Sequence, residues 1–394
     1  MSIRPSIRFR GSLLWICYIG FVSLGLPDTL IGVAWPSIRT TFGLHQNDIA
    51  WIFIGGGCSY FISSFFAGRL LKKFNVGVLL GASSALVALS GFDYAAARIW
   101  PLFAFGSLLH GLGSGAIDAG LNHYVASHFS ARHMNWLHAC YSLGAMLGPF
   151  LMTVMITHGD SWRMGYLIVA LTLLLLSILF FSTRARWDDR GTPSNISPDM
   201  PPTSPVSAAH ALRNRVVRLQ IVLFFIYTGL EVALGQWSFT VLTESRNIPR
   251  DLAGTWVTIY WASILAGRII FGFVVDRVGI DALIRLSIIV ALGGTALFAW
   301  NPMPQTSPLA LALAGLGLAV IFPCLMTRTP QRIGKEIAAH AIGFQVGAAM
   351  LGAATLPSLT GFVAQHAGLN FVAPSIFAMA CLLFLLHEAV VSCR

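Results

Sequence analysis

The feature that most constrains this chain is a series of apolar blocks, each about twenty residues long, separated by short polar segments. An α-helix rises about 1.5 Å per residue, so a block of this length crosses roughly 30 Å of hydrocarbon. The chain is 56% hydrophobic and only 10% charged, whereas soluble domains carry about 25% charged residues. We predict an all-α membrane protein whose twelve transmembrane helices lie at 12–36, 49–70, 77–93, 101–127, 135–157, 162–183, 217–242, 252–274, 282–300, 307–327, 338–364 and 370–391.

The distribution of basic residues predicts the orientation of these helices. With the N-terminus inside, all but five of the 25 Lys and Arg residues fall on the cytoplasmic side. The exceptions are Arg39, Arg98, Arg163, Arg246 and Arg250. Lys and Arg accumulate in the cytoplasmic loops of membrane proteins. We therefore expect a multi-pass protein of the cell inner (plasma) membrane with both termini in the cytoplasm, and a net charge of +10 that needs no nucleic-acid partner.

The longest polar segment divides the chain into two parts of six spans each. It covers 184–216 and holds five prolines, at 193, 198, 201, 202 and 205. Proline-rich polar sequence buries too little apolar surface to fold alone. We predict an N-terminal six-helix bundle at 1–183, a cytoplasmic linker at 184–216 and a C-terminal six-helix bundle at 217–394. The tetrapeptide AMLG occurs at 145–148 and again at 349–352, which indicates two pseudo-symmetric halves.

The motifs that would indicate an enzyme or a metalloprotein do not occur. The sequence has no phosphate-binding glycine loop, no HExxH and no GxSxG, and its six cysteines form no CxxC pair. We expect no enzymatic activity, no cofactor and no metal site.

The octapeptide GFVVDRVG (272–279) resembles the G-x-x-x-D-R-x-G loop of the major facilitator superfamily. The resemblance implies a twelve-helix transporter in which Asp276 and Arg277, with Arg69 in the corresponding first-half loop, form a cytoplasmic gating loop. The first-half copy departs from the family pattern, because Lys72 and Lys73 stand where an acid and a base are usual. The stretch LNHYVASHFSARHMNWLHACYSLGAMLGP (121–149) and YTGLEVALGQW (227–237) resemble the fucose permease-like branch of sugar:proton symporters.

Three carboxylates lie deep inside predicted spans: Asp28, Asp118 and Glu231. A charged side chain at the bilayer centre costs about 2.5–3.5 kcal/mol on insertion scales, so it survives where it faces water or a partner. In the superfamily, spans one, four, seven and ten line the central path, and three of these four spans carry one of the acids. We predict that the acids bind protons and polar substrate groups. The alternative is that each acid pairs with a neighbouring helix and stabilises packing.

Asp118 and Asn122 are four residues apart and therefore project from nearly the same helical face. An acid beside an amide offers both donors and acceptors to a polyol, and each group is a partner for the other when the site is empty. The alternative for Asn122 is a local hydrogen bond between helices.

Further polar and aromatic residues are candidates for the same site. Asn135 and His138 open span five and would form a hydrogen-bonding or proton-relay pair beside Asp118; the alternative is an interfacial cap and a solvated histidine. Aromatic rings stack on sugar rings, although most membrane Trp and Tyr residues lie at the interface. The remaining substrate candidates are Tyr227, Gln236, Trp237, Tyr260 and Gln345.

Taken together, the residues and the resemblance predict a secondary active transporter that moves a small polar solute, a sugar, with protons by alternating access. Its expected partners are a small-molecule substrate, protons and the lipid bilayer, and the expected oligomeric state is a monomer. The alternative is a drug or metabolite efflux proton antiporter of the same superfamily, because GAMLGP (144–149) matches a G-x-x-x-G-P pattern associated with drug:proton antiporters.

Overall fold

The computed structural model describes residues 7–129, 131–159, 161–187 and 208–393, and every regular element in these ranges is a helix. The first half contains α1 (Ile7–Asp28), α2 (Leu30–Phe42), η1 (Gln46–Ile49), α3 (Ala50–Lys73), α4 (Val76–Ala96), α5 (Trp100–His128), α6 (Ala131–His158), α7 (Trp162–Thr183) and η2 (Arg184–Trp187). The second contains α8 (Ala208–Arg213), α9 (Arg215–Thr240), η3 (Val241–Ser245), α10 (Arg250–Val278), α11 (Ile280–Trp300), η4 (Pro304–Thr306), α12 (Ser307–Leu318), α13 (Ile321–Ile333), α14 (Lys335–His366), η5 (Leu369–Phe371) and α15 (Val372–Ser392).

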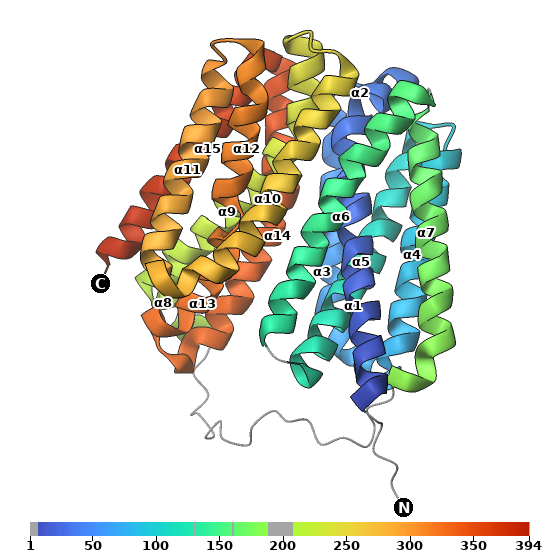
Figure 1. The fold of residues 1–394 in the computed structure, drawn as a ribbon, viewed down its shortest axis with the longest axis vertical. Coiled ribbons are helices and arrows are strands. Elements are labelled where there is room, and N and C mark those ends of the chain that lie inside the picture. Colours follow the sequence, from blue (N-terminus) through green and yellow to red (C-terminus); the bar gives the residue numbers. More distant parts are fainter. Residues whose placement is uncertain (1–6, 130, 160, 188–207, 394) are drawn as a thin grey trace, which may run out of the picture.

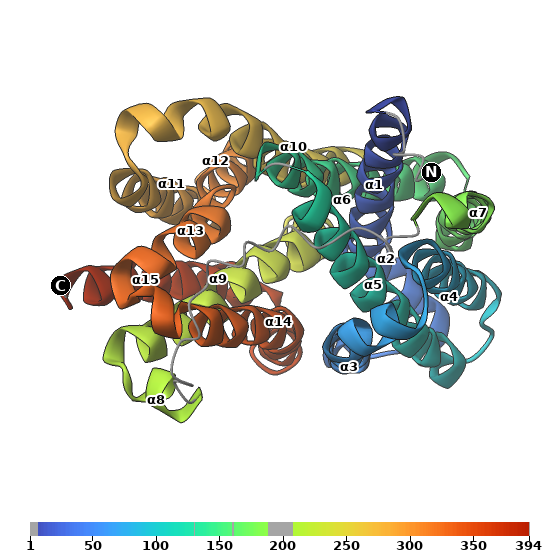
Figure 2. The same ribbon diagram turned by 90° about the horizontal axis from the view of Figure 1, so that it is seen from below.

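The long helices gather into two bundles that stand side by side, α1 to α7 in one and α9 to α15 in the other (Figure 1). Seen along the helix axes, α3, α5 and α6 of the first bundle face α9, α10 and α14 of the second (Figure 2). This arrangement confirms the predicted fold class of two six-helix halves. The boundaries of the predicted linker stay a prediction, because residues 188–207 lie outside the described ranges. We name the two ends of the molecule the α8 end and the η1 end.

Eleven helical stretches of the described chain are long and apolar enough to cross a membrane, one fewer than predicted. The twelfth predicted span is α5, which has 29 residues and is packed among the others. Its composition explains the difference, because α5 carries Asp118, Asn122 and several glycines in place of bulky apolar residues. The helix that looks least like a membrane span from its sequence therefore brings Asp118 and Asn122 into the bundle.

Two spans are interrupted near their middle. The first breaks at Thr29, between α1 and α2, directly after Pro27 and Asp28. The other breaks at Ala319 and Val320, between α12 and α13. Proline has no N–H and its ring clashes with the carbonyl four residues earlier. Pro323 therefore leaves the carbonyl of Ala319 without its helical donor, which accounts for the second break.

The GAMLGP segment lets α6 cross α1 at very short distance. A Cβ atom added to Gly144 would lie 2.0 Å from the carbonyl oxygen of Val22, and one added to Gly148 would lie 2.2 Å from Oγ1 of Thr29. The Thr29 hydroxyl also donates to the carbonyl of Ala145 at 2.9 Å. The motif thus has a structural function here: it holds the broken end of α1, and with it Asp28, against α6.

We predict that Gly144→Ala destabilises the protein, because the added methyl group would force α1 and α6 apart. Gly293→Ala in α11 is the matched control, since a Cβ atom there meets nothing within 4 Å. Alanine is favoured over glycine within a helix by up to about 1 kcal/mol, so the control should be neutral or stabilising. Thermal unfolding in detergent measures both variants. Equal melting temperatures for the two would contradict the close-crossing interpretation.

Candidate functional site

A cavity of about 550 Å³ lies between the two bundles and is lined by residues from both. We call it the central cavity. All three predicted carboxylates line it: Asp28 at the end of α1, Asp118 in α5 and Glu231 in α9. Acids that are distant in sequence, and that come from opposite halves, therefore share one chamber.

Asp28 is held by two partners from other helices. Its Oδ1 lies 2.8 Å from Nε2 of His110 in α5, and its Oδ2 accepts a hydrogen bond of 2.9 Å from the hydroxyl of Tyr141 in α6. Both partners also line the central cavity. The side chain of Asp28 is 31% exposed in this setting, so a cavity-bound molecule has access to it.

Asp118 has the neighbour that its sequence spacing predicts. Its Oδ1 accepts from the Nδ2 of Asn122 at 2.9 Å, one helical turn further along α5. Its Oδ2 accepts from the hydroxyl of Tyr60 in α3 at 2.8 Å. Each carboxylate oxygen thus has a neutral donor, which stabilises the acid inside the bundle.

Glu231 is the most buried of the three acids, with 8% of its surface exposed. Its Oε2 accepts a short hydrogen bond from the hydroxyl of Tyr227, four residues earlier in α9. Its Oε1 lies 3.8 Å from Nη2 of Arg268 in α10. The hydroxyl of Tyr260 donates to the backbone carbonyl of Glu231 at 2.8 Å and fixes α9 against α10.

Arg268 connects the helix break in the second half to the acid. Its Nε donates to the freed carbonyl of Ala319 at 3.3 Å. Its Nη1 crosses to the first half, where it donates to the carbonyl of His138 at 3.2 Å and to the hydroxyl of Ser142 at 2.5 Å. The guanidinium therefore touches both halves and lines the cavity.

Two polar atoms that are buried at the cavity have no hydrogen-bond partner among the described residues. They are Nε2 of Gln236 and Oγ1 of Thr228, both on α9. Thr228, Val232 and Gln236 recur every four residues and all line the cavity, so they form one stripe of the helix. Buried polar groups are nearly always hydrogen-bonded, so this stripe is suited to a ligand that supplies the missing partners.

Three predicted substrate contacts do not face the central cavity. Trp237, Tyr260 and Gln345 are fully buried and none of them lines it. Trp237 follows Gln236 by one residue, a rotation of about 100°, and its indole N–H donates to the carbonyl of Pro357. Gln345 joins Gln220 in a polar cluster among α9, α13 and α14. The contact of Tyr260 with the site is its hydrogen bond to the backbone of Glu231.

His138 lines the cavity but is not the predicted partner of Asp118. Among the described side chains, the partners of Asp118 are Tyr60 and Asn122, and the ring of His138 packs edge-on against Phe21 instead. The side chains of Asn135, Asp276 and Arg277 lie outside the part of the chain that the structure describes. Arg69 is exposed, lies over the ring of Phe66 and is not one of the residues that line the cavity.

The residues of the site that the sequence patterns miss are His110, Tyr60, Tyr141 and Arg268. His110 stands in the middle of an apolar block, and an ionisable residue at that depth is itself an indication of a site. The charge distribution places Arg268 on the cytoplasmic side, although it lies within the apolar run ASILAGRIIFGF. Tyr60 and Tyr141 carry no sequence signal of this kind, because their role depends on which helices meet.

Polar contacts between the halves close the η1 end of the cavity. Nη2 of Arg39 lies 2.7 Å from Oε1 of Glu244, and Nε2 of Gln46 donates to Oε2 of the same acid at 2.9 Å. The backbone N–H of Gln46 donates to Gln365 at 2.9 Å. We name these four residues the outer bridge. Towards the α8 end the cavity-lining residue Val346 is 37% exposed, whereas Gln236 on the η1 side is 4% exposed.

Comparison with known proteins accounts for this architecture. The family model of the Major Facilitator Superfamily matches residues 17–345 and, in a second overlapping match, 237–391. The chain belongs to the Major Facilitator Superfamily. As a superfamily member with these helices, it is a multi-pass membrane transport protein.

Several similar proteins within the superfamily have names that refer to hexoses. "Glucose/mannose transporter GlcP" of Bacillus subtilis is 24% identical over 363 residues, which cover 90% of this chain and 88% of that protein. "Sodium-dependent glucose transporter 1" of Homo sapiens is 23% identical and the match covers 87% and 72% of the two chains. A further similar protein, whose name refers to no substrate, is "Bypass of stop codon protein 6" of Saccharomyces cerevisiae; it is 23% identical and the match covers 90% of this chain and 78% of that protein.

Solved transporter structures have the same fold. The nucleoside transporter NupG superposes with a TM-score of 0.74 at 15% identity, and the match covers 96% of this chain and 98% of the other. The D-xylose-proton symporter gives a TM-score of 0.75 at 14% identity, with 96% and 97% covered. At these identities the likeness concerns the fold alone.

Proposed function

We propose that this superfamily member is a secondary active transporter that moves a monosaccharide together with protons across the plasma (inner) membrane. The observation that carries the proposal is the central cavity itself. Carboxylates from both halves and unpartnered polar groups face one chamber that lies between two bundles. The protein acts as a monomer with cytoplasmic termini, and no enzymatic step is part of the cycle.

The size and lining of the cavity favour a small polyhydroxylated ligand. Binding pockets for small molecules measure about 300–1,000 Å³, and the central cavity has about 550 Å³. Thr228 and Gln236 offer hydrogen-bonding atoms that lack partners, and Asp118 with Asn122 offers an acid and an amide. Aromatic residues also line the cavity, where their faces can pack on the apolar face of a sugar ring; they include Tyr60, Tyr227 and Trp261. The hexose transporters among the similar proteins support the same substrate class.

Asp28 and His110 form the proposed proton-carrying pair. Nε2 of His110 lies 2.8 Å from Oδ1 of Asp28, so a proton can be shared between the imidazole and the carboxylate inside the cavity. Glu231 is held by the cation of Arg268, so its charge is already balanced. We therefore assign the coupling proton to Asp28 and His110. We assign a different function to Glu231 and Arg268, which is to position the two halves around the substrate.

The contacts between the halves differ at the two ends of the cavity, and this difference is the basis of the proposed alternating access. The outer bridge joins the halves at the η1 end, and we infer that the cavity is reached from the α8 end, where its lining is more exposed. With the orientation that the basic residues predict, this arrangement is the inward-facing state. Opening to the outside then requires separation of Arg39 from Glu244 and closure of the halves at the α8 end.

We predict that Thr228→Val weakens hexose binding, because it removes a hydroxyl that is free to bond substrate without changing side-chain volume. A neutral hydrogen bond contributes about 0.5–1.5 kcal/mol, so the KM for D-glucose should rise about two- to tenfold. Thr240→Val is the matched control: its Oγ1 is also buried and unpartnered on α9, but Thr240 does not line the cavity. Counterflow of labelled D-glucose in proteoliposomes measures both. Equal KM values for the two variants would place the substrate elsewhere.

We predict that Asp28→Asn abolishes glucose accumulation driven by a pH gradient but retains counterflow, since exchange needs no net proton movement. Asp48→Asn, in η1 and outside the cavity, should accumulate glucose as wild type does. Proteoliposomes are tested with an imposed pH gradient and, separately, with an imposed sodium gradient. Accumulation by Asp28→Asn in the pH gradient, or wild-type accumulation in the sodium gradient alone, would refute coupling to protons through Asp28.

A further inference from the structure

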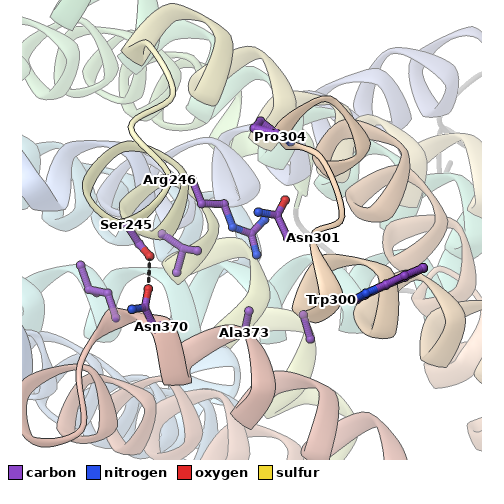
Figure 3. Close-up of a pocket in the computed structure, with 10 residues that line it drawn as sticks. Ser245, Arg246, Trp300, Asn301, Pro304, Asn370 and Ala373 are labelled. Atoms are coloured by element: carbon purple, nitrogen blue, oxygen red, sulfur yellow. Dashed lines mark hydrogen bonds between the residues drawn. The ribbon is translucent and has the colours of Figure 1, made fainter.

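A second pocket of about 330 Å³ lies at the η1 end of the C-terminal half, outside the central cavity. It is formed where η3, the turn after α11 and the start of α15 meet (Figure 3). The described lining residues of the two pockets do not overlap. Those of the second pocket are Val241, Ser245, Arg246, Ala299, Trp300, Asn301, Pro304, Leu369, Asn370 and Ala373, and none of these described residues is acidic.

Arg246 is a half-buried cation of this pocket. Its Nη1 donates to the hydroxyl of Ser307 at 3.0 Å, its Nη2 donates to the carbonyl of Phe298, and its guanidinium carbon lies 4.3 Å from the centre of the Phe298 ring. These bonds use two of the five N–H donors of the group. Among the described residues no carboxylate lies within ion-pair distance of Arg246. Burial lowers the pKa of Arg246 to about 10, so the side chain still carries its charge at neutral pH.

Two asparagine side chains add further donors to the pocket. The Oδ1 of Asn370 accepts from the hydroxyl of Ser245 at 2.7 Å, and the Oδ1 of Asn301 accepts from the hydroxyl of Ser307 at 3.3 Å. Because each carbonyl oxygen is occupied, the amide nitrogen of each side chain remains for a ligand. Figure 3 shows the guanidinium of Arg246 and the side chain of Asn301 directed towards each other across the pocket. A guanidinium with a neighbouring amide suits an oxyanion, and Asn370 lines the same pocket.

We propose that this pocket binds a phosphate group, with Arg246, Asn301 and Asn370 as its donors. The guanidinium matches two phosphate oxygens at once, which a lysine would not do. Trp300, which lines the pocket, is 76% exposed. Trp residues gather at the level of lipid headgroups, so this side chain favours the headgroup of an anionic phospholipid as the source of the phosphate.

The test uses the full chain purified in detergent and three probes. Phosphatidylglycerol and a diacylglycerol with the same acyl chains are compared by native mass spectrometry, and inorganic phosphate is titrated by calorimetry. Retention of phosphatidylglycerol but not of diacylglycerol supports a lipid headgroup, and saturable binding of inorganic phosphate supports a free anion. The absence of saturable binding for all three probes would overturn the proposal.

Arg246→Gln should weaken binding about tenfold or more, since it removes the charged donor. Arg250→Gln removes the same charge four residues further along, on an exposed side chain that does not line the pocket, and should bind as wild type does. Asn370→Asp is a second variant that controls for misfolding, because it keeps the acceptor for Ser245 but adds a carboxylate to the pocket. We expect it to lose binding while its melting temperature is unchanged or higher. Wild-type affinity in both Arg246→Gln and Asn370→Asp would show that the pocket is not the site.

Discussion

The structure depends on how carboxylates are kept inside a bundle that is surrounded by hydrocarbon. Each of the three acids is compensated locally, and each in a different way. Asp28 contacts an imidazole, Asp118 accepts from two neutral donors, and Glu231 faces a guanidinium. Removal of one partner of a buried charge leaves the other uncompensated, which is strongly destabilising. Each half must therefore fold so that its acids meet their partners, and the cavity lies between the two halves.

The backbone takes part in the same compensation. Pro323 frees the carbonyl of Ala319, Arg268 donates to it, and the same guanidinium faces Glu231. In the first half, Pro27 precedes the break at Thr29, and the glycines of α6 allow the close crossing that holds Asp28 beside Tyr141. Interrupted helices are tolerated at membrane depth where their polar groups line a cavity or are buried in protein. At the second pocket a guanidinium again satisfies a backbone carbonyl at a helix end, because Arg246 donates to the carbonyl of Phe298 in the last turn of α11.

The membrane spans and the three acids of the cavity could be predicted from the sequence, because the free energies of burying apolar segments and charged groups are large and depend on local sequence. Apolar blocks predict the spans, and the cost of a buried charge singles out Asp28, Asp118 and Glu231. The Asp118 and Asn122 pair follows from helical periodicity alone.

The partners of the acids could not be predicted in the same way, since Tyr60, Tyr141 and His110 reach their acids only through helix packing. Trp237 and Tyr260 are predicted to contact substrate because they are aromatic residues within spans, yet neither of them lines the cavity. The polar or aromatic character of a residue does not show which face of a buried helix meets the cavity. The distribution of basic residues assigns Arg268 to the cytoplasmic side, because it uses only the position of a residue near the end of a span. It contains no information on the direction of the side chain.

In the proposed cycle, sugar and proton bind in one chamber and cross the membrane together. The most direct measurement follows the pH outside lightly buffered proteoliposomes that contain the wild-type protein and no imposed gradient, while D-glucose is added. Cotransport predicts an alkaline shift that follows glucose entry, is abolished by a protonophore, and does not occur with L-glucose. Glucose entry without any proton movement would contradict it.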